Sequence, residues 1–453
     1  MTPEQSGSGS ILIENGAVVT LDAEGTVYAP GYLACEGGRV AALGAGEARP
    51  EIRARAVQRI DAHHQAVLPG LTNAHTHLSQ TFMRGLAAGR SLLSWLRDLI
   101  WPLQAAMTPD DMRLAALLGL LENLRCGVTH VVDHQKITSS PAHTDAVCQA
   151  AQTVGARLTL ARSWADRGKN AEPPESIIAD LERLFEQYPH SSSTADLVSI
   201  ANGPLVPWRC SADTLQETHA LAQQQGAPTH IHVSETREEV QMTVDETGLR
   251  PVMWLDSLGV LDERVEVVHA VWVEEAEIAR LAARKATVIH CPVSNAVLGS
   301  GAAPLAALRQ SGVRLRLGTD GAASNDTQDL FETTKWALGL ARVTSLDAAN
   351  PSPADVLTMA AAGASLHPGA RADIIVVNLN HPRAMPVHDP VSALALSTHG
   401  SDVNTVIVGG HVVMQAQRVL GVDEPALLEA CRGAAAALRQ RAERTKYHDS
   451  SHS

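Results

Sequence analysis

Two histidines two residues apart carry the first sign of chemistry in this sequence. His75 and His77 end the segment Leu68-Pro-Gly-Leu-Thr-Asn-Ala-His75-Thr-His77, which begins inside an apolar run over 66–71. Alternate residues of a β-strand point the same way, so the two imidazoles are expected to face one point, as metal ligands do. Because the chain has 20 His among 453 residues, a chance pair is the simpler interpretation, and the metal prediction depends on residues further along.

Short apolar runs that alternate with helical stretches predict how these histidines are positioned. After the first strand, such runs lie at 128–133, 157–163, 197–203, 229–235, 265–271, 286–292 and 313–320. Strands that alternate with helices form a parallel sheet, and eight such units close into a barrel. We therefore expect an α/β fold with a (β/α)8 TIM barrel over residues 66–369.

Both ends of the chain have a different, β-rich pattern. Runs such as ILIENGAVVT near the start and VNTVIVGGHVVM near the end are separated by Gly, Asp and Asn, which is typical of short strands and turns. We expect residues 1–65 and 370–420 to form one small composite β-sandwich that flanks the barrel. Residues 421–453 are then a C-terminal helix and tail.

Polar residues recur at the ends of the predicted strands, where barrel enzymes place their active sites. Strand five reaches His232 and strand eight ends at Asp320. Together with His75 and His77 they would offer three imidazoles and a carboxylate, a donor set that suits Zn(II), with Fe(II) as the alternative. A structural zinc would normally include Cys ligands; the six cysteines are scattered and form no CxxC.

The same strand ends predict one metal ion and a hydrolytic reaction. A two-metal site commonly needs a bridging, modified Lys on the fourth strand, and the run at 197–203 contains no Lys. The open position of a single divalent ion would hold a water whose pKa is lowered toward about 7. Asp320 can accept the proton of that water, His269 can orient the hydroxide, and Glu235 can pass a proton to a ring nitrogen. Attack on a carbon that bears an amine would then release ammonia.

At these residues the sequence resembles the amidohydrolase superfamily, in its mononuclear deaminase branch. The matching segments are NAHTH (73–77), HVSE (232–235), VVHAV (267–271), HCPVSN (290–295), LGTDGAASND (317–326) and the tail RADIIVV (371–377). The resemblance covers nearly the whole chain. It implies a metal on His75, His77, His232 and Asp320, with Glu235, His269 and Asp320 as catalytic residues.

Two groups within this branch suggest different substrates. Deaminases of S-adenosylhomocysteine or methylthioadenosine carry a Glu and a His suited to ribose, where this sequence has Gln104 in WPLQ and Leu205 in GPLVPW. The s-triazine hydrolases, such as atrazine chlorohydrolase and melamine deaminase, are similar at Gln80 and Gln104 but have Asp or Asn at the position of Gly321. The predicted substrate-binding residues are Gln80, Gln104, Leu205 and Ser324, although two surface glutamines are the alternative interpretation.

The first function hypothesis is an aminohydrolase of a flat N-heteroaromatic ring without ribose, such as a triazine, a pterin or a purine base. The alternatives are a nucleoside deaminase of the S-adenosylhomocysteine or methylthioadenosine type, an s-triazine chlorohydrolase, and a barrel protein that has lost its metal. The net charge of -13 argues against a nucleic-acid partner. Neither a membrane-spanning run nor a signal peptide is evident. We expect a cytoplasmic enzyme with a small-molecule heteroaromatic substrate, and we leave homo-oligomerisation open.

Overall fold

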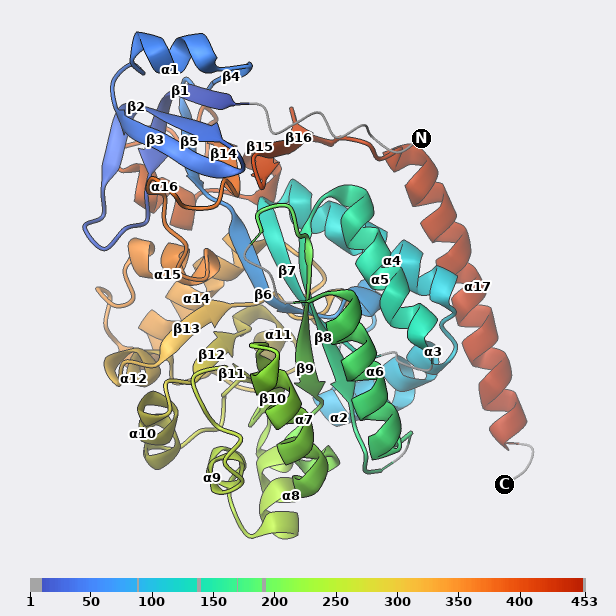
Figure 1. Ribbon diagram of the computed structural model, residues 1–453. Coiled ribbons are helices and arrows are strands. Elements are labelled where there is room, and N and C mark those ends of the chain that lie inside the picture. Colours follow the sequence, from blue (N-terminus) through green and yellow to red (C-terminus); the bar gives the residue numbers. More distant parts are fainter. Residues whose placement is uncertain (1–9, 88, 137–139, 169, 190–192, 451–453) are drawn as a thin grey trace.

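The computed structural model describes residues 10–87, 89–136, 140–168, 170–189 and 193–450. At its centre lies an eight-stranded parallel sheet with the order β13-β12-β11-β10-β9-β8-β7-β6 (Figure 1). Its strands are β6 (Leu71–Thr76), β7 (Val128–Gln135), β8 (Arg157–Trp164), β9 (Val198–Pro204), β10 (Thr229–Val233), β11 (Val265–His269), β12 (Thr287–His290) and β13 (Arg314–Leu317). Each of the eight predicted strands is present.

Hydrogen bonds join the first and last strands at their carboxyl ends. The backbone N–H of Asp320 donates to the carbonyl of His75 at 2.9 Å. The side-chain amide of Asn73 donates to Thr319 Oγ1 at 2.8 Å, and its oxygen accepts from the Thr319 N–H at 3.0 Å. These bonds bring β6 and β13 together, and the α/β TIM barrel predicted from the strand pattern is confirmed.

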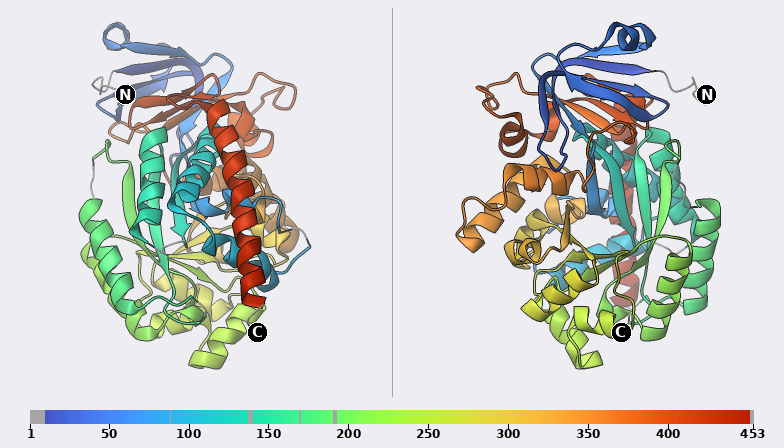
Figure 2. Two further views of the ribbon diagram at one scale, coloured as in Figure 1. Left: turned by 90° about the vertical axis from the view of Figure 1, so that its right-hand side faces the viewer. Right: turned by 60° about the vertical axis from the view of Figure 1, so that its left-hand side comes forward.

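Helices surround the barrel (Figure 2). The outer helices are α4 (Pro109–Arg125), α5 (Pro141–Val154), α6 (Pro174–Gln187), α7 (Ala212–Gln224), α8 (Arg237–Thr247), α9 (Pro251–Ser257), α10 (Glu275–Ala283), α12 (Leu305–Gln310), α14 (Leu330–Ser345) and α15 (Pro353–Ala360). In α6, Ile177, Leu181, Leu184 and Phe185 are buried, the spacing by which an amphipathic helix presents one apolar face to a core.

Shorter helices lie in the connections between strands and longer helices. They are α1 (Pro50–Arg55), the 3-10 helix Leu78–Met83, α2 (Leu92–Trp95), the π-helix Leu96–Ile100, α3 (Trp101–Ala105), the 3-10 helix Pro207–Arg209, α11 (Pro292–Val297), α13 (Ala322–Asn325), α16 (Pro390–Leu396) and the 3-10 helix Gly400–Asp402.

A second sheet combines strands from both ends of the chain, as expected. Its order is β17-β16-β15-β14-β5-β1-β2-β3, with β4 paired to β1. The strands are β1 (Ile11–Val19), β2 (Val27–Glu36), β3 (Arg39–Ala45), β4 (Gln58–Asp61), β5 (Gln65–Pro69), β14 (Ile374–Asn378), β15 (Val403–Val408), β16 (His411–Gln415) and β17 (Arg418–Val419).

The apolar run that precedes His75 contributes to both sheets. It is divided at Gly70, so that β5 pairs with β14 in the second sheet while β6 enters the barrel. A Cβ at Gly70 would lie 2.3 Å from the side chain of Thr129, so this crossing point admits no larger residue without a shift. The chain thus passes from one sheet to the other five residues before the first candidate ligand.

The last element is the long helix α17 (Glu424–Ser450), which packs along α4 (Figure 1). Arg441 forms an ion pair with Asp111 at the start of α4. The expected C-terminal helix is therefore present and extends to Ser450. None of the helices in the described ranges combines the length and the hydropathy needed to cross a membrane.

Candidate metal and catalytic centre

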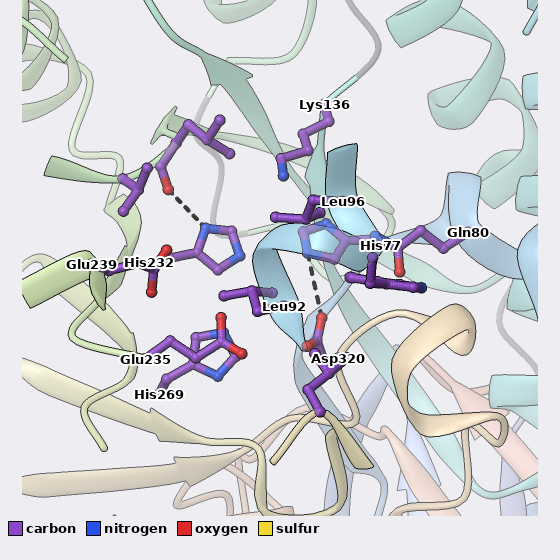
Figure 3. A pocket seen from close by; sticks show the side chains of 14 residues that line it. His77, Gln80, Leu92, Leu96, Lys136, His232, Glu235, Glu239, His269 and Asp320 are labelled. Atoms are coloured by element: carbon purple, nitrogen blue, oxygen red, sulfur yellow. Dashed lines mark hydrogen bonds and ion pairs between the residues drawn. The ribbon is translucent and has the colours of Figure 1, made fainter. Parts of the chain in front are cut away.

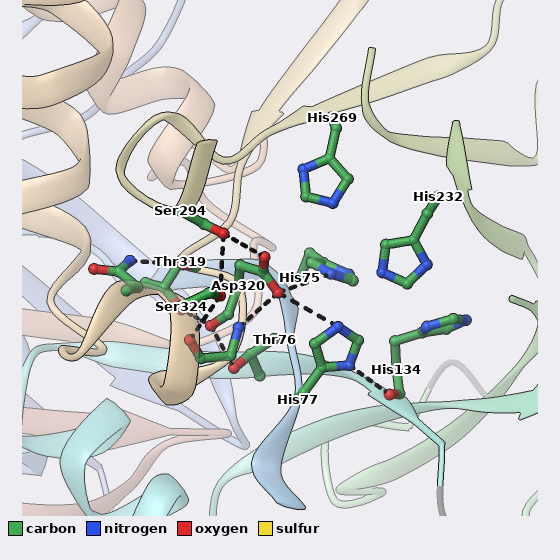
Figure 4. A network of polar contacts seen from close by, with 12 residues as sticks. His75, Thr76, His77, His134, His232, His269, Ser294, Thr319, Asp320 and Ser324 are labelled. Atoms are coloured by element: carbon green, nitrogen blue, oxygen red, sulfur yellow. Dashed lines mark hydrogen bonds and ion pairs between the residues drawn. The ribbon is translucent and has the colours of Figure 1, made fainter. Parts of the chain in front are cut away.

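Three imidazoles gather at the carboxyl ends of β6 and β10 (Figure 4). The ring centroids of His75 and His77 are 4.8 Å apart, and those of His75 and His232 are 4.9 Å apart. One ring nitrogen from each of these three residues lies within 4.8 Å of the other two, and all three side chains are buried. The structure therefore brings the three predicted histidine ligands around one point.

Hydrogen bonds fix which nitrogen each histidine presents. His77 Nδ1 donates to the carbonyl oxygen of His134 at 2.8 Å, and His232 Nδ1 donates to that of Leu205 at 2.8 Å. Each ring is left with its Nε2 lone pair toward the shared point. Burial lowers the pKa of His232 well below its ordinary value and that of His77 to about 4. Both rings are accordingly neutral near pH 7, the state that binds a metal.

His75 is oriented by a chain of two further side chains. Its Nδ1 lies 2.8 Å from His230 Nε2, and His230 Nδ1 lies 2.8 Å from Glu266 Oε2. Glu266 can only accept, so His230 donates to Glu266 and accepts from His75. The Nε2 of His75 is buried without a hydrogen-bond partner among the described residues. Such an orphaned nitrogen, held by a carboxylate through a hydrogen-bond chain, fits a metal ligand.

Asp320 supplies the fourth donor. Its Oδ1 lies 3.5 Å from His75 Nε2 and 3.4 Å from His77 Nε2, and two ligand atoms of a tetrahedral zinc are about 3.4 Å apart. Ser294 donates to Oδ2 at 2.6 Å. Burial raises the pKa of Asp320, but the contact with His75, together with the other neighbouring histidines, outweighs burial and holds that pKa well below its ordinary value. An ionised carboxylate and three neutral imidazoles fit a divalent metal ion.

Glu235 and His269 lie beside these four residues. His269 Nε2 is 3.4 Å from Glu235 Oε2, and Ser300 donates to Glu235 Oε1 at 2.9 Å. Burial and the charge of Asp320 raise the pKa of Glu235 to about 8, so this carboxyl can hold a proton near neutral pH. His269 Nδ1 donates to Asn295 Oδ1 at 3.0 Å, which turns its Nε2 toward the centre.

Backbone strain coincides with these positions. His269 and Asp320 have φ angles of 74° and 63°, and Ser234, one residue before Glu235, has a φ of 55°. Residues other than glycine rarely adopt this left-handed region, and the exceptions concentrate at functional sites. At each of these strand ends the backbone turns so that a polar side chain reaches the centre.

A small cavity lined by polar and apolar side chains opens next to the candidate ligands. Two of the four predicted substrate-binding residues, Gln80 and Leu205, line it, and Gln80 is labelled in Figure 3. Gln104 is not among the lining residues; its amide points to Ser79 Oγ at 3.5 Å. Ser324 lies behind Asp320, within 3.0 Å of Ser294 Oγ. Only Gln80 and Leu205 therefore face the ligand space directly.

Gly321 explains how Gln80 reaches this cavity. A Cβ at position 321 would lie 1.9 Å from Gln80 Oε1. The Gln80 side chain thus occupies the space that the side chain of an Asp or Asn at 321 would take. Gln80 Oε1 is buried and has no hydrogen-bond partner within the described part of the chain, which leaves it free to accept from a ligand.

Several residues of the centre were not predicted from the sequence. Lys136, Glu239 and Trp95 line the cavity. Burial, followed by the charge of Arg209, lowers the pKa of Lys136 to about 8, and burial raises that of Glu239 to about 7. The second strand was expected to end at residue 133, but β7 extends to Gln135. Reading that strand to its true end would have placed Lys136 among the polar residues at strand ends.

Comparison with known proteins agrees with this geometry. The sequence model of the amidohydrolase family matches residues 66–413. The chain belongs to the amidohydrolase family. It is 35% identical over 428 residues to a 5-methylthioadenosine/S-adenosylhomocysteine deaminase of Pyrococcus furiosus, covering 92% of this chain and 98% of the relative. It is 36% identical over 388 residues to a 5'-deoxyadenosine deaminase of Methanothermobacter thermautotrophicus, covering 84% and 89%.

Solved structures of two kinds resemble this amidohydrolase. An adenosine deaminase from Xanthomonas campestris with bound zinc superposes with a TM-score of 0.88 at 29% identity, over 95% of this chain and 99% of the other. A mutant of atrazine chlorohydrolase from Arthrobacter aurescens, complexed with zinc and atraton, gives a TM-score of 0.88 at 25% identity, over 94% and 100%. This amidohydrolase is a metal-dependent hydrolase of carbon–nitrogen bonds that deaminates a heteroaromatic amine.

Proposed function

We propose that this amidohydrolase removes the exocyclic amine from a free N-heteroaromatic ring, using one bound Zn(II). The observation that supports the free ring is the lining of the cavity. Leu205 faces the ligand space, and Gln104 points to Ser79 instead. The two positions expected to carry ribose-binding groups therefore offer no charged contact to a sugar.

The four clustered side chains would hold the ion: His75, His77, His232 and Asp320. A divalent ion in such a site supplies the Lewis acidity that activates water near neutral pH. The number of ions is proposed from the donor set, because the two candidate groups, His75–His77–His232 and His75–His269–Asp320, share His75 and contain a single carboxylate between them. Within the described part of β9, the fourth barrel strand, no Lys is available as a bridging ligand.

The remaining steps are assigned to the chain's own residues. Asp320 accepts the proton of the attacking water, and His269 orients that water through its Nε2. Glu235, which can hold a proton near neutral pH, delivers it to the ring nitrogen next to the carbon under attack. Asp320 then passes the proton it took from water to the departing nitrogen, the carbon–nitrogen bond breaks to release ammonia, and the hydroxyl proton returns to Glu235 as the ring carbonyl forms.

A nucleoside deaminase is the second candidate function, because curated relatives that cover most of this chain are named as deaminases of adenosine-type nucleosides. The two candidates differ in the expected role of ribose. A nucleoside deaminase needs polar contacts to the sugar hydroxyls, and a hydrogen bond to a charged group contributes about 1.5–3 kcal/mol. The free-ring proposal predicts that ribose adds nothing to the rate.

The test compares kcat/KM for ammonia release. Methylthioadenosine, S-adenosylhomocysteine and adenosine form one set, and melamine-type triazines, pterins and guanine-type bases form the other. We expect the free rings to be preferred by up to one or two orders of magnitude, at about 1.4 kcal/mol for each tenfold. Gln104→Glu should shift the ratio toward nucleosides, whereas Gln149→Glu, at an exposed position of α5, should not. Preference of the wild type for methylthioadenosine or S-adenosylhomocysteine would replace the free-ring proposal with the second candidate.

A further inference from the structure

Lys136 is a cation at the cavity that the proposed reaction does not use. It follows β7 directly, and its side chain lines the cavity together with the apolar residues Leu92 and Leu96. In Figure 3 its ammonium group points toward the space beside His77, on the far side of the histidines from Glu235. Lys136 is partly buried, so its amine is close to the ligand space and poorly exposed to water.

Within the described residues, no hydrogen bond or ion pair to Lys136 is formed by a side chain. The three carboxylates that line the same cavity attract Lys136 only at longer range, and their hydrogen bonds go to other groups. Glu235 accepts from Ser300, Glu239 accepts from the backbone N–H of Thr236, and Asp320 accepts from Ser294. A partly desolvated ammonium without a partner is costly, and a ligand group with negative charge would offset that cost.

We infer that Lys136 recognises an ionised oxo group on the substrate ring, so that the preferred substrate is an amino-oxo-heterocycle rather than a ring that carries amines alone. The inference rests on the proposed function and narrows its substrate class. Trp95 supports it from the same cavity, because its indole N–H is buried without a partner among the described residues. Lys136 and Trp95 both donate, which suits oxygen acceptors on the ring edge away from the departing amine.

A carboxylate on a substrate tail would present the same chemistry to Lys136. The placement of Lys136 favours the ring, because Lys136 lines the same cavity as His77 and Asp320 and its ammonium group points toward the space beside His77 (Figure 3). The ring carbon under attack must lie beside these candidate ligands. A group bound by Lys136 therefore belongs to the ring itself.

The test uses the metal-loaded enzyme and paired ligands. Ammelide carries one amine and two oxo groups on the triazine ring, and melamine carries three amines on the same ring. Lys136→Met should lower kcat/KM for ammelide by about 10–100-fold, the loss expected for a charge-assisted hydrogen bond, and should change the value for melamine far less. Lys136→Arg should retain most of the ammelide activity. Lys335→Met, at an exposed position of α14, should leave both values unchanged.

A binding measurement separates recognition from turnover. Cyanurate has the oxo groups and no amine, so calorimetry should show that it binds the wild type at least about tenfold more tightly than Lys136→Met. Equal losses for ammelide and melamine would overturn the inference, since Lys136 would then act on the reaction itself. A loss confined to S-adenosylhomocysteine relative to methylthioadenosine would overturn the assignment to the ring. If no free ring releases ammonia, the proposed function fails, whereas failure of cyanurate to bind contradicts the Lys136 inference independently.

Discussion

His269 and Glu235 face each other at the edge of the metal centre, with His269 Nε2 3.4 Å from Glu235 Oε2. Each side chain is held from behind, His269 by Asn295 and Glu235 by Ser300. A hydrogen-bonded support of this kind fixes the geometry of a proton donor before the substrate arrives. The pair is therefore arranged to orient water on one side and to transfer a proton on the other.

Replacing Glu235 by Gln should stop turnover while the metal stays bound. The amide preserves the shape of the side chain and can still accept from Ser300, but it carries no transferable proton. Loss of general acid–base catalysis costs about 10²–10⁴-fold in rate. Ammonia release and metal content would be measured on the same preparation. Glu238→Gln, at an exposed position of α8, is the control, and near wild-type ammonia release by Glu235→Gln would remove Glu235 from the mechanism.

Glu266→Gln should weaken metal binding although Glu266 is not a candidate ligand. Its carboxylate fixes the His230 ring, which in turn orients His75, and loss of such an outer partner typically costs about 10–100-fold in metal affinity. Competition with a chelator would measure the affinity. Glu263→Gln, at an exposed position three residues earlier, should behave as the wild type. An unchanged affinity in Glu266→Gln would show that Glu266 serves only its ion pair with Arg316.

This centre could be predicted from the sequence because its residues lie at the ends of strands, which the alternation of apolar runs and helices marks. The residues at the ends of the eight strands identified the clustered histidines and Asp320. Strand periodicity could have identified the chain behind His75, since His230 lies two residues before His232 on the same face of β10. Glu266 could not be found in this way, because its role depends on the register that places it beside His230 on the neighbouring strand β11.

The substrate side of the cavity was less predictable, because Gln80 and Gln104 lie on short helices in the connection that follows β6. Gln80 and Gln104 look equivalent in the sequence, yet Gln80 lies against Gly321 and lines the cavity, while Gln104 is turned to Ser79. The difference comes from the packing of the 3-10 helix Leu78–Met83 and α3. No local sequence signal specifies that packing.

Gly321→Ala should raise KM for the ring substrate. The new methyl group would lie 1.9 Å from Gln80 Oε1, so the Gln80 side chain must leave its position in the cavity. The backbone φ of -67° at this residue is open to alanine, and the effect is therefore expected in substrate binding and less in folding. Steady-state kinetics would check this, with Gly339→Ala, where no atom lies within 4 Å of the added group, as the control. Unchanged KM in Gly321→Ala would mean that Gln80 does not contact the substrate.

Asp133→Asn should make stability less dependent on pH. Burial raises the pKa of Asp133 to about 7, and its carboxylate accepts from the Leu78 N–H at 2.8 Å, a bond that Asn can also accept. Because the pKa of Asp133 is higher in the folded than in the unfolded state, its contribution to the free energy of unfolding is complete below a pH of about 4. That contribution is lost as the pH rises toward about 7, at up to about 1.4 kcal/mol per pH unit. Urea unfolding between pH 5 and 8 should show the variant gaining stability relative to the wild type. A constant difference across that range would contradict the assignment.

Ammonia release by the metal-loaded and the metal-stripped protein, with metal content measured on each sample, tests the account most directly. With a panel of amine-bearing heterocycles, we predict that activity rises with metal content to a maximum at one Zn(II) per chain. It should fall with removal by a chelator and return on addition of zinc. His75→Ala and His232→Ala should hold no ion and release no ammonia. Activity that persists without metal, or that requires two tightly bound ions per chain, would contradict the account.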